Sequence, residues 1–160
     1  MRLLFFLFVL TSLYGTQCCP FCDPEVIERQ KIYENDQILV LYTHKPVTEG
    51  HCLVIPKRHV ERFEELSEQE AIQLFHAIQK VDRAVEKTLG TRPYILLQKN
   101  GSQVGQSVPH VHVHYIPRKE DETSVAYFAI QLLTRDWFPT LSGSEQQRMI
   151  EQLKLAFCEE

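Results

Sequence analysis

The stretch GQSVPHVHVHYIPR, residues 105–118, places a histidine at every second position of an apolar run. Residues i, i+2 and i+4 of a strand point to one face, so His110, His112 and His114 are predicted to share a face. The opposite face is apolar and suited to a core; it consists of Val111, Val113 and Tyr115. Pro117 ends the strand, because proline cannot continue a central strand ladder.

The histidine face has three interpretations. Three rings that are merely satisfied by hydrogen bonds would be costly to pair in register. Two imidazoles of an H-x-H strand could instead hold a metal ion. The third interpretation is nucleophilic chemistry, in which the central ring attacks an electrophile while its neighbours orient it and protonate the leaving group.

The preceding VGQSV sequence favours the third interpretation. Gly105 permits a tight turn, and residues 105–107 can direct backbone N–H groups and a hydroxyl into one concavity that binds an anion. A phosphate held there beside a neutral imidazole is set up for nucleotidyl transfer, with catalysis supplied mainly by positioning and by stabilisation of charge on the phosphorus oxygens.

Strands that follow one another through short turns precede this segment. Residues 31–45, KIYENDQILVLYTHK, predict two strands joined by a turn at 34–37, where asparagine and aspartate supply the turn chemistry. HCLVIPK, residues 51–57, predicts a buried strand ended by Pro56, and YILLQKNG, residues 94–101, predicts another. With helices grouped between and after them, these strands indicate an antiparallel α+β domain.

Capping signals mark the helices. Ser67 and Glu70 form an S-x-x-E capping box before a long helix, and Gly90 stands where its end requires a positive φ. The positions at helical spacing are Leu74, Phe75, Ile78, Val81, Val85 and Leu89. Residues 124–136 predict a second helix. Ser142 and Glu145 repeat the capping spacing before a final helix, whose apolar positions are Met149, Ile150, Leu153 and Phe157.

Size and charge limit the class of protein. With 160 residues, 44% of them hydrophobic, the chain is long enough for one domain with a core. A formal net charge of −4 argues against a binder of nucleic acid or of membrane surfaces, while an anionic small molecule remains compatible. The chain divides into a hydrophobic segment at 1–17, a domain at 18–120 and a helical extension at 121–160.

The first 17 residues, MRLLFFLFVLTSLYGTQ, differ from the rest. One arginine precedes an apolar run at residues 3–10, which resembles a short secretory signal and is too short to span a bilayer. The alternative is a hydrophobic arm that packs on the domain or on a partner. A cytoplasmic location is favoured, and export is the alternative.

The five cysteines are too few and too unevenly spaced for a disulfide scaffold. Cys52 lies in an apolar run and is predicted to be a small core residue. Cys19 and Cys22 have C-x-x-C spacing, which alone is compatible with a zinc site, a disulfide or a redox pair.

HVHVHYI, residues 110–116, resembles the H-φ-H-φ-H-φ-φ signature of the histidine triad (HIT) superfamily, where φ is an apolar residue. GHCLVIPKRHVERF, residues 50–63, is similar to an earlier strand of the family, and the likeness extends over residues 19–118. The resemblance implies a homodimeric α+β fold with an antiparallel sheet, a nucleotide substrate and a covalent nucleotidyl-histidine intermediate. HYIPRKED and the C-terminal tail look more like the dinucleoside polyphosphate hydrolase branch, named for the fragile histidine triad protein, since the Gly-Gly-Arg run of the phosphoramidase branch is absent.

The resemblance also implies roles for the histidines. His112 is the nucleophile, and its second ring nitrogen needs an acceptor, for which a backbone carbonyl is expected. His114 contacts the α-phosphate and helps to protonate the leaving group. His110 orients the nucleophilic ring, with His51 of the earlier strand as its expected partner.

The family's phosphate-contacting loop corresponds to Gly105, Gln106, Ser107 and Val108 of this chain. Thr43 replaces an asparagine that binds ribose in the hydrolase branch. Lys99 replaces a Gln or Asn near the phosphates, a role that Asn100 could take by a one-residue shift, and a lysine could itself reach a phosphate. The candidates for sandwiching a base are Phe21, Ile32, Leu39 and Leu41, of which most are expected to be core.

Bacterial HIT proteins with this arrangement bind one structural zinc, so the resemblance implies the ligands Cys19, Cys22, His59 and His110. Two sulfur and two nitrogen ligands suit tetrahedral zinc. No catalytic metal or other catalytic cofactor is implied, and magnesium would at most accompany the phosphates of the substrate.

The sequence therefore predicts a hydrolase that cleaves dinucleoside polyphosphates, such as diadenosine tri- or tetraphosphate, at the α-phosphate. Two alternatives use the same residues, namely a nucleoside phosphoramidase and a nucleotide-binding adaptor with little turnover. A further alternative is a zinc protein whose triad histidines are themselves the ligands.

Overall fold

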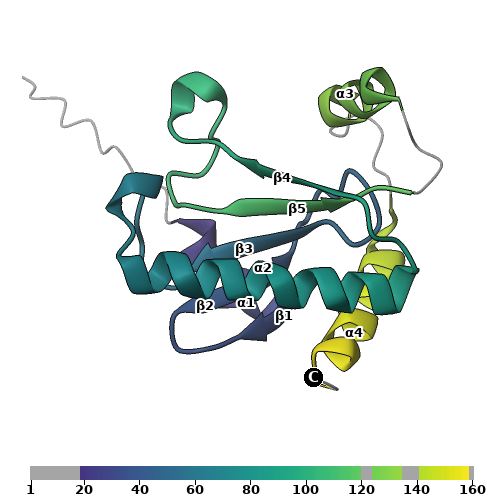
Figure 1. Ribbon diagram of the computed structural model, residues 1–160, viewed down its shortest axis with the longest axis horizontal. Coiled ribbons are helices and arrows are strands. Elements are labelled where there is room, and N and C mark those ends of the chain that lie inside the picture. The colour runs from purple at the N-terminus through teal and green to yellow at the C-terminus, as the bar shows by residue number, and fades with distance from the viewer. Residues whose placement is uncertain (1–18, 120–123, 135–140, 159–160) are drawn as a thin grey trace, which may run out of the picture.

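The structure, a computed structural model, describes residues 19–119, 124–134 and 141–158. The signal-like segment 1–17 and the connector at 135–140 therefore lie outside the described residues. Five antiparallel strands form one sheet in the order β1-β2-β3-β5-β4, with a long helix lying across it (Figure 1). The strands are β1 (Lys31–Glu34), β2 (Ile38–Tyr42), β3 (Cys52–Pro56), β4 (Tyr94–Gln98) and β5 (Val113–Pro117). The predicted α+β class is confirmed.

The β1–β2 hairpin turns where the sequence predicts it. The side-chain oxygen of Asn35 accepts hydrogen bonds from the backbone N–H groups of Gln37 and Ile38, at 2.9 and 2.7 Å. An asparagine that bonds its own backbone in this way substitutes for a backbone turn bond. Strand β3 then pairs in full register with β2 and ends at Pro56, as predicted.

Helix α2 (Glu68–Leu89) begins and ends at the predicted signals. Ser67 and Glu70 form the capping box, and Gly90 has a φ of 67° at the C-terminal end. Leu74, Ile78 and other positions at helical spacing are buried against the sheet. Phe75 is an exception, because it is 57% exposed on the flank of the helix rather than in the core. The apolar stripe of α2 is thus wider than the face that the sheet covers.

Two further helices follow the sheet, and α4 packs on the same side as α2. Helix α4 (Gly143–Cys158) starts at the predicted Ser142–Glu145 capping pair and packs on α2 and β1. Its predicted apolar positions are buried, and the Phe157 ring stacks on Tyr33. Helix α3 (Val125–Thr134) follows the predicted helical sequence, and the Arg118 guanidinium lies over its Phe128 ring. Within the described ranges, none of the helices is long and apolar enough to cross a membrane.

A smaller apolar cluster covers the other face of the sheet. It consists of Leu39, Leu41, Leu53 and Ile55, with Phe21 and Ile27 packed against it. Phe21 lies in a 3-10 turn (Pro20–Cys22), and Ile27 belongs to helix α1 (Pro24–Gln30), which the sequence analysis did not predict. Asp23 caps α1 by accepting a hydrogen bond from Glu25 N–H, and proline occupies the first turn.

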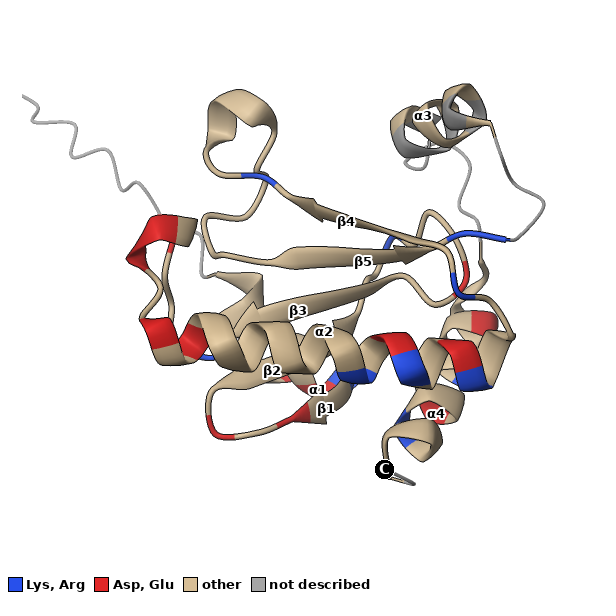
Figure 2. Ribbon diagram, in the orientation of Figure 1, with Lys and Arg blue, Asp and Glu red and all other residues tan. Residues whose placement is uncertain are grey.

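The histidine strand is shorter than predicted. Strand β5 starts at Val113, and the preceding residues follow an irregular path in which Val111 N–H donates to the Val60 carbonyl instead of to a strand. From Val113 onward β5 pairs with β3 on one side and β4 on the other. On the α2 face, the Tyr115 hydroxyl donates to Asp82 at 2.7 Å, which ties β5 to the long helix. Strands β3, β4 and β5 carry no charged residue (Figure 2).

Candidate active site and metal centre

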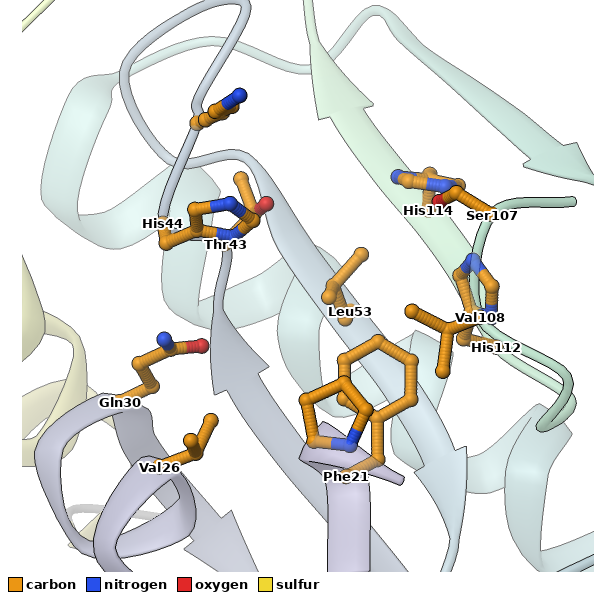
Figure 3. A pocket seen from close by; sticks show the side chains of 12 residues that line it. Phe21, Val26, Gln30, Thr43, His44, Leu53, Ser107, Val108, His112 and His114 are labelled. Atoms are coloured by element: carbon orange, nitrogen blue, oxygen red, sulfur yellow. The ribbon is translucent and has the colours of Figure 1, made fainter. Parts of the chain in front are cut away.

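A cleft lies on the face of the sheet opposite α2 and contains about 540 Å³ of empty space, part of it open to solvent. His112, His114, Ser107 and Val108 form one wall, across from residues of α1 and of the segment after β2 (Figure 3). The complete lining is Pro20, Phe21, Val26, Gln30, Thr43, His44, Lys45, Leu53, Ser107, Val108, His112 and His114. Two of the three histidines of the 110–114 segment, His112 and His114, thus line the cleft.

His112 has a defined tautomer. Its Nδ1 lies 2.6 Å from the backbone carbonyl oxygen of His110, and a carbonyl can only accept, so Nδ1 carries the proton. Nε2 consequently keeps its lone pair for the cleft. Burial lowers the pKa of His112 and the Lys99 charge adds to this effect, although the bond to the His110 carbonyl acts in the opposite direction. The structure therefore supplies the backbone acceptor that the sequence analysis expects for a nucleophilic ring.

His51 pairs with His114, not with His110 as expected. The backbone N–H of Val47 donates to His51 Nδ1 at 3.1 Å, which leaves the His51 proton on Nε2. His51 Nε2 lies 3.0 Å from His114 Nδ1 and donates to it. His114 then carries its own proton on Nε2. The expected pairing is wrong because β5 pairs with β3 in a register that places Leu53 opposite His114, which brings the residue before β3 to that ring.

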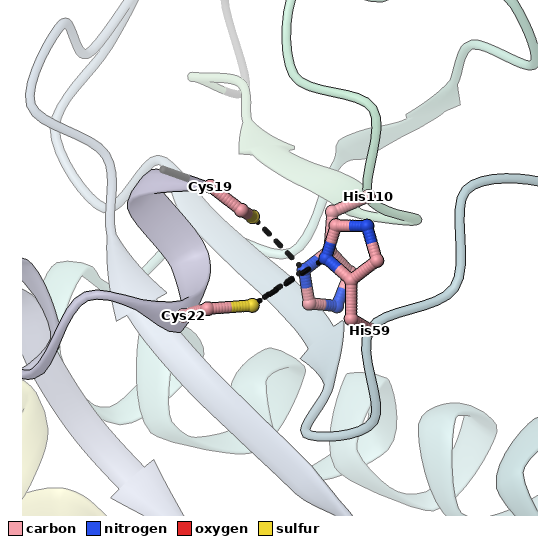
Figure 4. A group of neighbouring side chains, drawn as sticks. All are labelled: Cys19, Cys22, His59 and His110. Carbon is pink, nitrogen blue, oxygen red and sulfur yellow. Dashed lines mark hydrogen bonds between the residues drawn. The ribbon is translucent and has the colours of Figure 1, made fainter. Parts of the chain in front are cut away.

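His110 is fully buried, and its ring does not line the cleft. It lies instead beside Cys19, Cys22 and His59, which together with it form the metal cluster (Figure 4). Its Nε2 donates to the Pro56 carbonyl at 2.9 Å, so Nδ1 bears a lone pair. That atom lies 3.3 Å from Cys19 Sγ and 3.7 Å from Cys22 Sγ, while His59 Nδ1 lies 3.5 Å from Cys22 Sγ. One ligand atom from each of the four residues lies within 4.8 Å of all the others.

These distances fit a tetrahedral zinc ion. Bonds of about 2.3 Å to sulfur and 2.0–2.1 Å to nitrogen place sulfur and nitrogen ligands about 3.6 Å apart. The three sulfur–nitrogen distances, from 3.3 to 3.7 Å, lie around that value. No disulfide joins Cys19 to Cys22, and the carbonyl of Pro56 orients His110 as outer partners orient metal-bound histidines. The donor set and its spacing therefore suit the metal that the sequence predicts.

The predicted phosphate loop separates into lining and supporting residues. Gly105 has a φ of 83°, in the region that favours glycine, and the Ser107 and Val108 that follow it line the cleft. Gln106 instead braces the loop, since its amide accepts from Gly101 N–H at 2.6 Å and donates to the Glu61 carbonyl at 3.0 Å. The Gln106 side chain, which was expected to contact phosphate, thus stabilises the loop by hydrogen bonds to its backbone and to that of Glu61.

The two residues before this loop take different positions. Asn100 accepts from Phe63 N–H at 2.9 Å and donates to Glu64 at 2.7 Å, so its amide supports the loop instead of facing the cleft. Lys99 donates to the Gly105 carbonyl at 3.4 Å and is near enough to affect the pKa of His112. Of this pair, Lys99 remains the candidate for a phosphate contact.

The opposite wall contains residues that the sequence analysis missed. Val26 and Gln30 come from α1, and His44 and Lys45 follow the predicted Thr43. The signal for the two residues of α1 was Asp23 followed by Pro24, a pair that is typical of the start of a helix. Ile32, Leu39 and Leu41 are core as expected, whereas Phe21 lines the cleft.

A model of the HIT domain matches residues 25–121, which is more than half of the chain. Protein hit of Bacillus subtilis is 40% identical over 108 residues, which cover 66% of this chain and 74% of that protein. The bis(5'-adenosyl)-triphosphatase of Dictyostelium discoideum is 35% identical over 101 residues, covering 62% of this chain and 68% of that enzyme. The adenosine 5'-monophosphoramidase of Schizosaccharomyces pombe is 36% identical over 92 residues, covering 58% and 66%.

Solved structures agree with the fold. A zinc-bound histidine triad family protein from Mycobacterium smegmatis has a TM-score of 0.70 at 23% identity, covering 91% of this chain and 96% of that one. A member of the HIT family from Bacillus subtilis has a TM-score of 0.59 at 38% identity, covering 66% and 76%.

Proposed function

This chain belongs to the HIT family, and from that premise we propose that it hydrolyses dinucleoside polyphosphates at the α-phosphate through a nucleotidyl-His112 intermediate. The observation that carries the proposal is the His110 carbonyl at 2.6 Å from His112 Nδ1, which leaves Nε2 as an unprotonated nucleophile aimed into a cleft. A neutral imidazole with this lone pair free is the nucleophile that attack at phosphorus requires.

In the first displacement, His112 Nε2 forms a bond to the α-phosphorus and the bond to the bridging oxygen breaks. His114 gives its Nε2 proton to that oxygen, and the nucleotide leaves. The positive charge on the His112 ring is stabilised by the bond from Nδ1–H to the His110 carbonyl. In the second displacement, water attacks the phosphorus, the bond from phosphorus to His112 Nε2 breaks, and His114 Nε2 takes a proton from the water. The products are a nucleoside monophosphate and the remaining nucleotide.

The nucleoside occupies the cleft between the Phe21 ring and the far wall. Phe21, Val26 and Leu53 offer apolar surfaces to a base. Thr43, Gln30 and the neighbouring polar side chains of the far wall offer hydrogen bonds to ribose and to the base edge. Ser107 and the backbone after Gly105 are placed on the histidine side, where the phosphates would lie. The triphosphatase of Dictyostelium discoideum supports the polyphosphate substrate by its similarity.

A nucleoside phosphoramidase is the second candidate, because the yeast monophosphoramidase is as similar to this chain as the triphosphatase. Both reactions use the same nucleophile and differ in whether oxygen or nitrogen leaves. Rates on adenosine phosphoramidates and on diadenosine tri- and tetraphosphate, measured side by side, distinguish the two. Faster turnover of the phosphoramidates would assign the chain to the second activity.

We further propose a structural zinc at Cys19, Cys22, His59 and His110. The ion would join the N-terminal turn, the loop after β3 and the segment before β5. Bound there, zinc supplies folding energy rather than chemistry, because all four positions of a tetrahedron are taken by the protein.

A homodimer through β4 is the proposed assembly. Strand β4 lies at the edge of the sheet and carries no charged residue, although edge strands that stay unpaired are commonly protected by charge (Figure 2). Its Tyr94 and Leu96 are 42% and 45% exposed, and Ile72 and Phe75 on α2 are 41% and 57% exposed. These four side chains provide an apolar surface for a second copy.

The proposed mechanism is tested by trapping the intermediate. Enzyme is mixed with diadenosine tetraphosphate, quenched in base within milliseconds to seconds, and digested for mass spectrometry. We expect adenylate on the peptide that contains His112 and none in His112→Asn, which should bind adenosine monophosphate without turnover. A His112→Asn variant with wild-type hydrolysis would contradict the mechanism, and turnover of the wild type without any adduct would indicate direct attack by water.

A further inference from the structure

The Cys19–Cys22 turn faces two sites at once. Its cysteine sulfurs belong to the metal cluster, while Phe21, which lies between them in the same 3-10 turn, lines the nucleotide cleft. The Phe21 ring centroid is 5.1 Å from that of His112 and 5.9 Å from that of His110, with both pairs edge to face. The wall of the cleft next to the nucleophile is therefore built by the metal-binding turn.

The metal cluster connects this turn to the body of the domain. In the turn itself, the Cys22 N–H donates a backbone hydrogen bond to the Cys19 carbonyl at 2.9 Å. Cys22 is exposed and Cys19 only half-buried, so burial of the cysteines adds little. Phe21 packs on the small apolar cluster of the sheet. A metal ion bound to all four ligands would connect the two cysteine sulfurs of the turn to His59 and His110, which belong to the body of the domain.

His110 makes a second connection between the two sites. Its ring belongs to the metal cluster, and its backbone carbonyl accepts the bond from His112 Nδ1. Fixing the ring by Pro56 on one nitrogen and by metal on the other fixes the residue whose carbonyl orients the nucleophile. Phe21 and His110 thus link the metal cluster to the His112 ring by two separate contacts.

We propose that metal binding at the cluster and nucleotide binding in the cleft are thermodynamically coupled, with Phe21 as the positioning residue that carries most of the coupling. The inference rests on the proposed nucleotide site and adds its regulation by zinc. Coupling of this kind is reciprocal, so zinc tightens nucleotide binding by the same factor by which nucleotide tightens zinc binding. We expect a factor of about 10, within the usual range for linked sites.

The experiment measures both sides of this linkage. Calorimetry gives the Kd of adenosine monophosphate for the zinc-loaded protein and for the metal-free protein, whose fold is checked by circular dichroism. Competition with a chelator of known zinc affinity then gives the zinc Kd with and without saturating adenosine monophosphate. This second measurement starts from the zinc-loaded protein, so it gives an answer even if the metal-free chain unfolds. We expect the factor by which zinc lowers the Kd of adenosine monophosphate to equal the factor by which adenosine monophosphate lowers the Kd of zinc.

Two variants locate the coupling. Phe21→Ala should keep zinc at full stoichiometry, because the four ligands remain, while the coupling factor falls towards one. Val26→Ala is the matched control, since Val26 lines the same cleft from α1 and is not part of the turn. It should weaken nucleotide binding yet keep the coupling factor of the wild type.

Each outcome bears on one of the proposals. Equal Kd values for adenosine monophosphate with and without zinc, or a zinc Kd that saturating nucleotide leaves unchanged, would overturn the coupling. An unchanged factor in Phe21→Ala would overturn the role of Phe21. A zinc-loaded wild type that binds no adenosine monophosphate would overturn the proposed function and the inference with it, which is distinct from binding without coupling.

Discussion

The Nε2 atom of His51 lies 3.0 Å from Nδ1 of His114, and the backbone N–H of Val47 sets the direction of this bond by occupying the other nitrogen of His51. A main-chain donor that cannot change its role thereby determines where His114 keeps its proton. That proton is on Nε2, the atom from which the proposed mechanism transfers it to the leaving group.

Replacing His51 should slow departure of a poor leaving group. His51→Leu removes the donor to His114 Nδ1, so the Nε2 tautomer is no longer favoured. We expect kcat for diadenosine tetraphosphate to fall about 100-fold, in the range for loss of general acid catalysis, with little change in KM. For a nucleoside 4-nitrophenyl phosphate, whose leaving group needs no proton, kcat of His51→Leu should fall less than tenfold. His51→Gln retains an N–H donor, so its kcat for diadenosine tetraphosphate should lie between those of His51→Leu and the wild type. Equal losses on both substrates would contradict this role.

Gly105→Ala should disturb the phosphate loop. A φ of 83° is strained for any residue with a Cβ, whereas the three nearest atoms that the new methyl would meet belong to the flexible Lys99 side chain, from 3.4 Å outwards. We expect the free energy of unfolding to fall by about 1 kcal/mol from backbone strain, and KM to rise as the loop shifts.

Gly143→Ala is the control for that variant. Gly143 begins α4, and a Cβ there would meet none of the described residues within 4 Å, so stability and KM should stay the same or stability should rise slightly. Urea denaturation and steady-state kinetics test both variants. A Gly105→Ala protein with unchanged KM would show that the loop conformation does not affect substrate binding.

The ion pair at the start of α2 predicts acid sensitivity. Arg58 Nε and Nη2 donate to the two oxygens of Glu70 at 2.9 and 2.8 Å, and these bonds hold the pKa of Glu70 at about 2. Because the folded-state pKa lies below the unfolded one, the stabilisation is complete above the ordinary glutamate pKa and is lost as the pH falls towards 2.

Glu70→Gln should therefore lose about 1–2 kcal/mol of unfolding free energy at pH 7, a value reduced by the half exposure of Arg58. The variant's stability should depend less on pH between about 5 and 2 than that of the wild type. Chemical denaturation across that range measures the difference. Parallel curves for the two proteins would exclude Glu70 as a source of the acid sensitivity.

Charge at the β4 edge should prevent dimerisation. Leu96→Glu places a carboxylate in the exposed apolar surface proposed for the second copy, and we expect a monomer in sedimentation velocity where the wild type is a dimer. Leu155→Glu on α4 is the control, because Leu155 is even more exposed, at 66%, and lies outside that surface. A dimeric Leu96→Glu protein would move the interface elsewhere.

Local chemistry made much of this fold predictable. The Ser67–Glu70 capping box and Gly90 define α2 from within its own sequence, and alternation separates His112 and His114 from Val113. The pairing of His51 with His114 was not predictable, because it depends on the register between β3 and β5, more than 60 residues apart.

The far wall of the cleft was missed for a related reason. Helix α1 has only 7 residues, too few for hydrophobic periodicity to identify, and its packing on the second face of the sheet is what brings Gln30 to the cleft. The turn at Cys19–Cys22 was recognised by its spacing, but spacing does not show that Phe21 points towards His112.

Strand β5 is enclosed between β3 and β4, so the peptide groups that carry His114 and Tyr115 are bonded on both sides. Local opening of the sheet can begin at β4 or β1 without separating this strand from β3. The amide protons of β5 should accordingly exchange with solvent only in the largest opening events, close to the rate of global unfolding. Fraying of the outer strands would then reach His114 last.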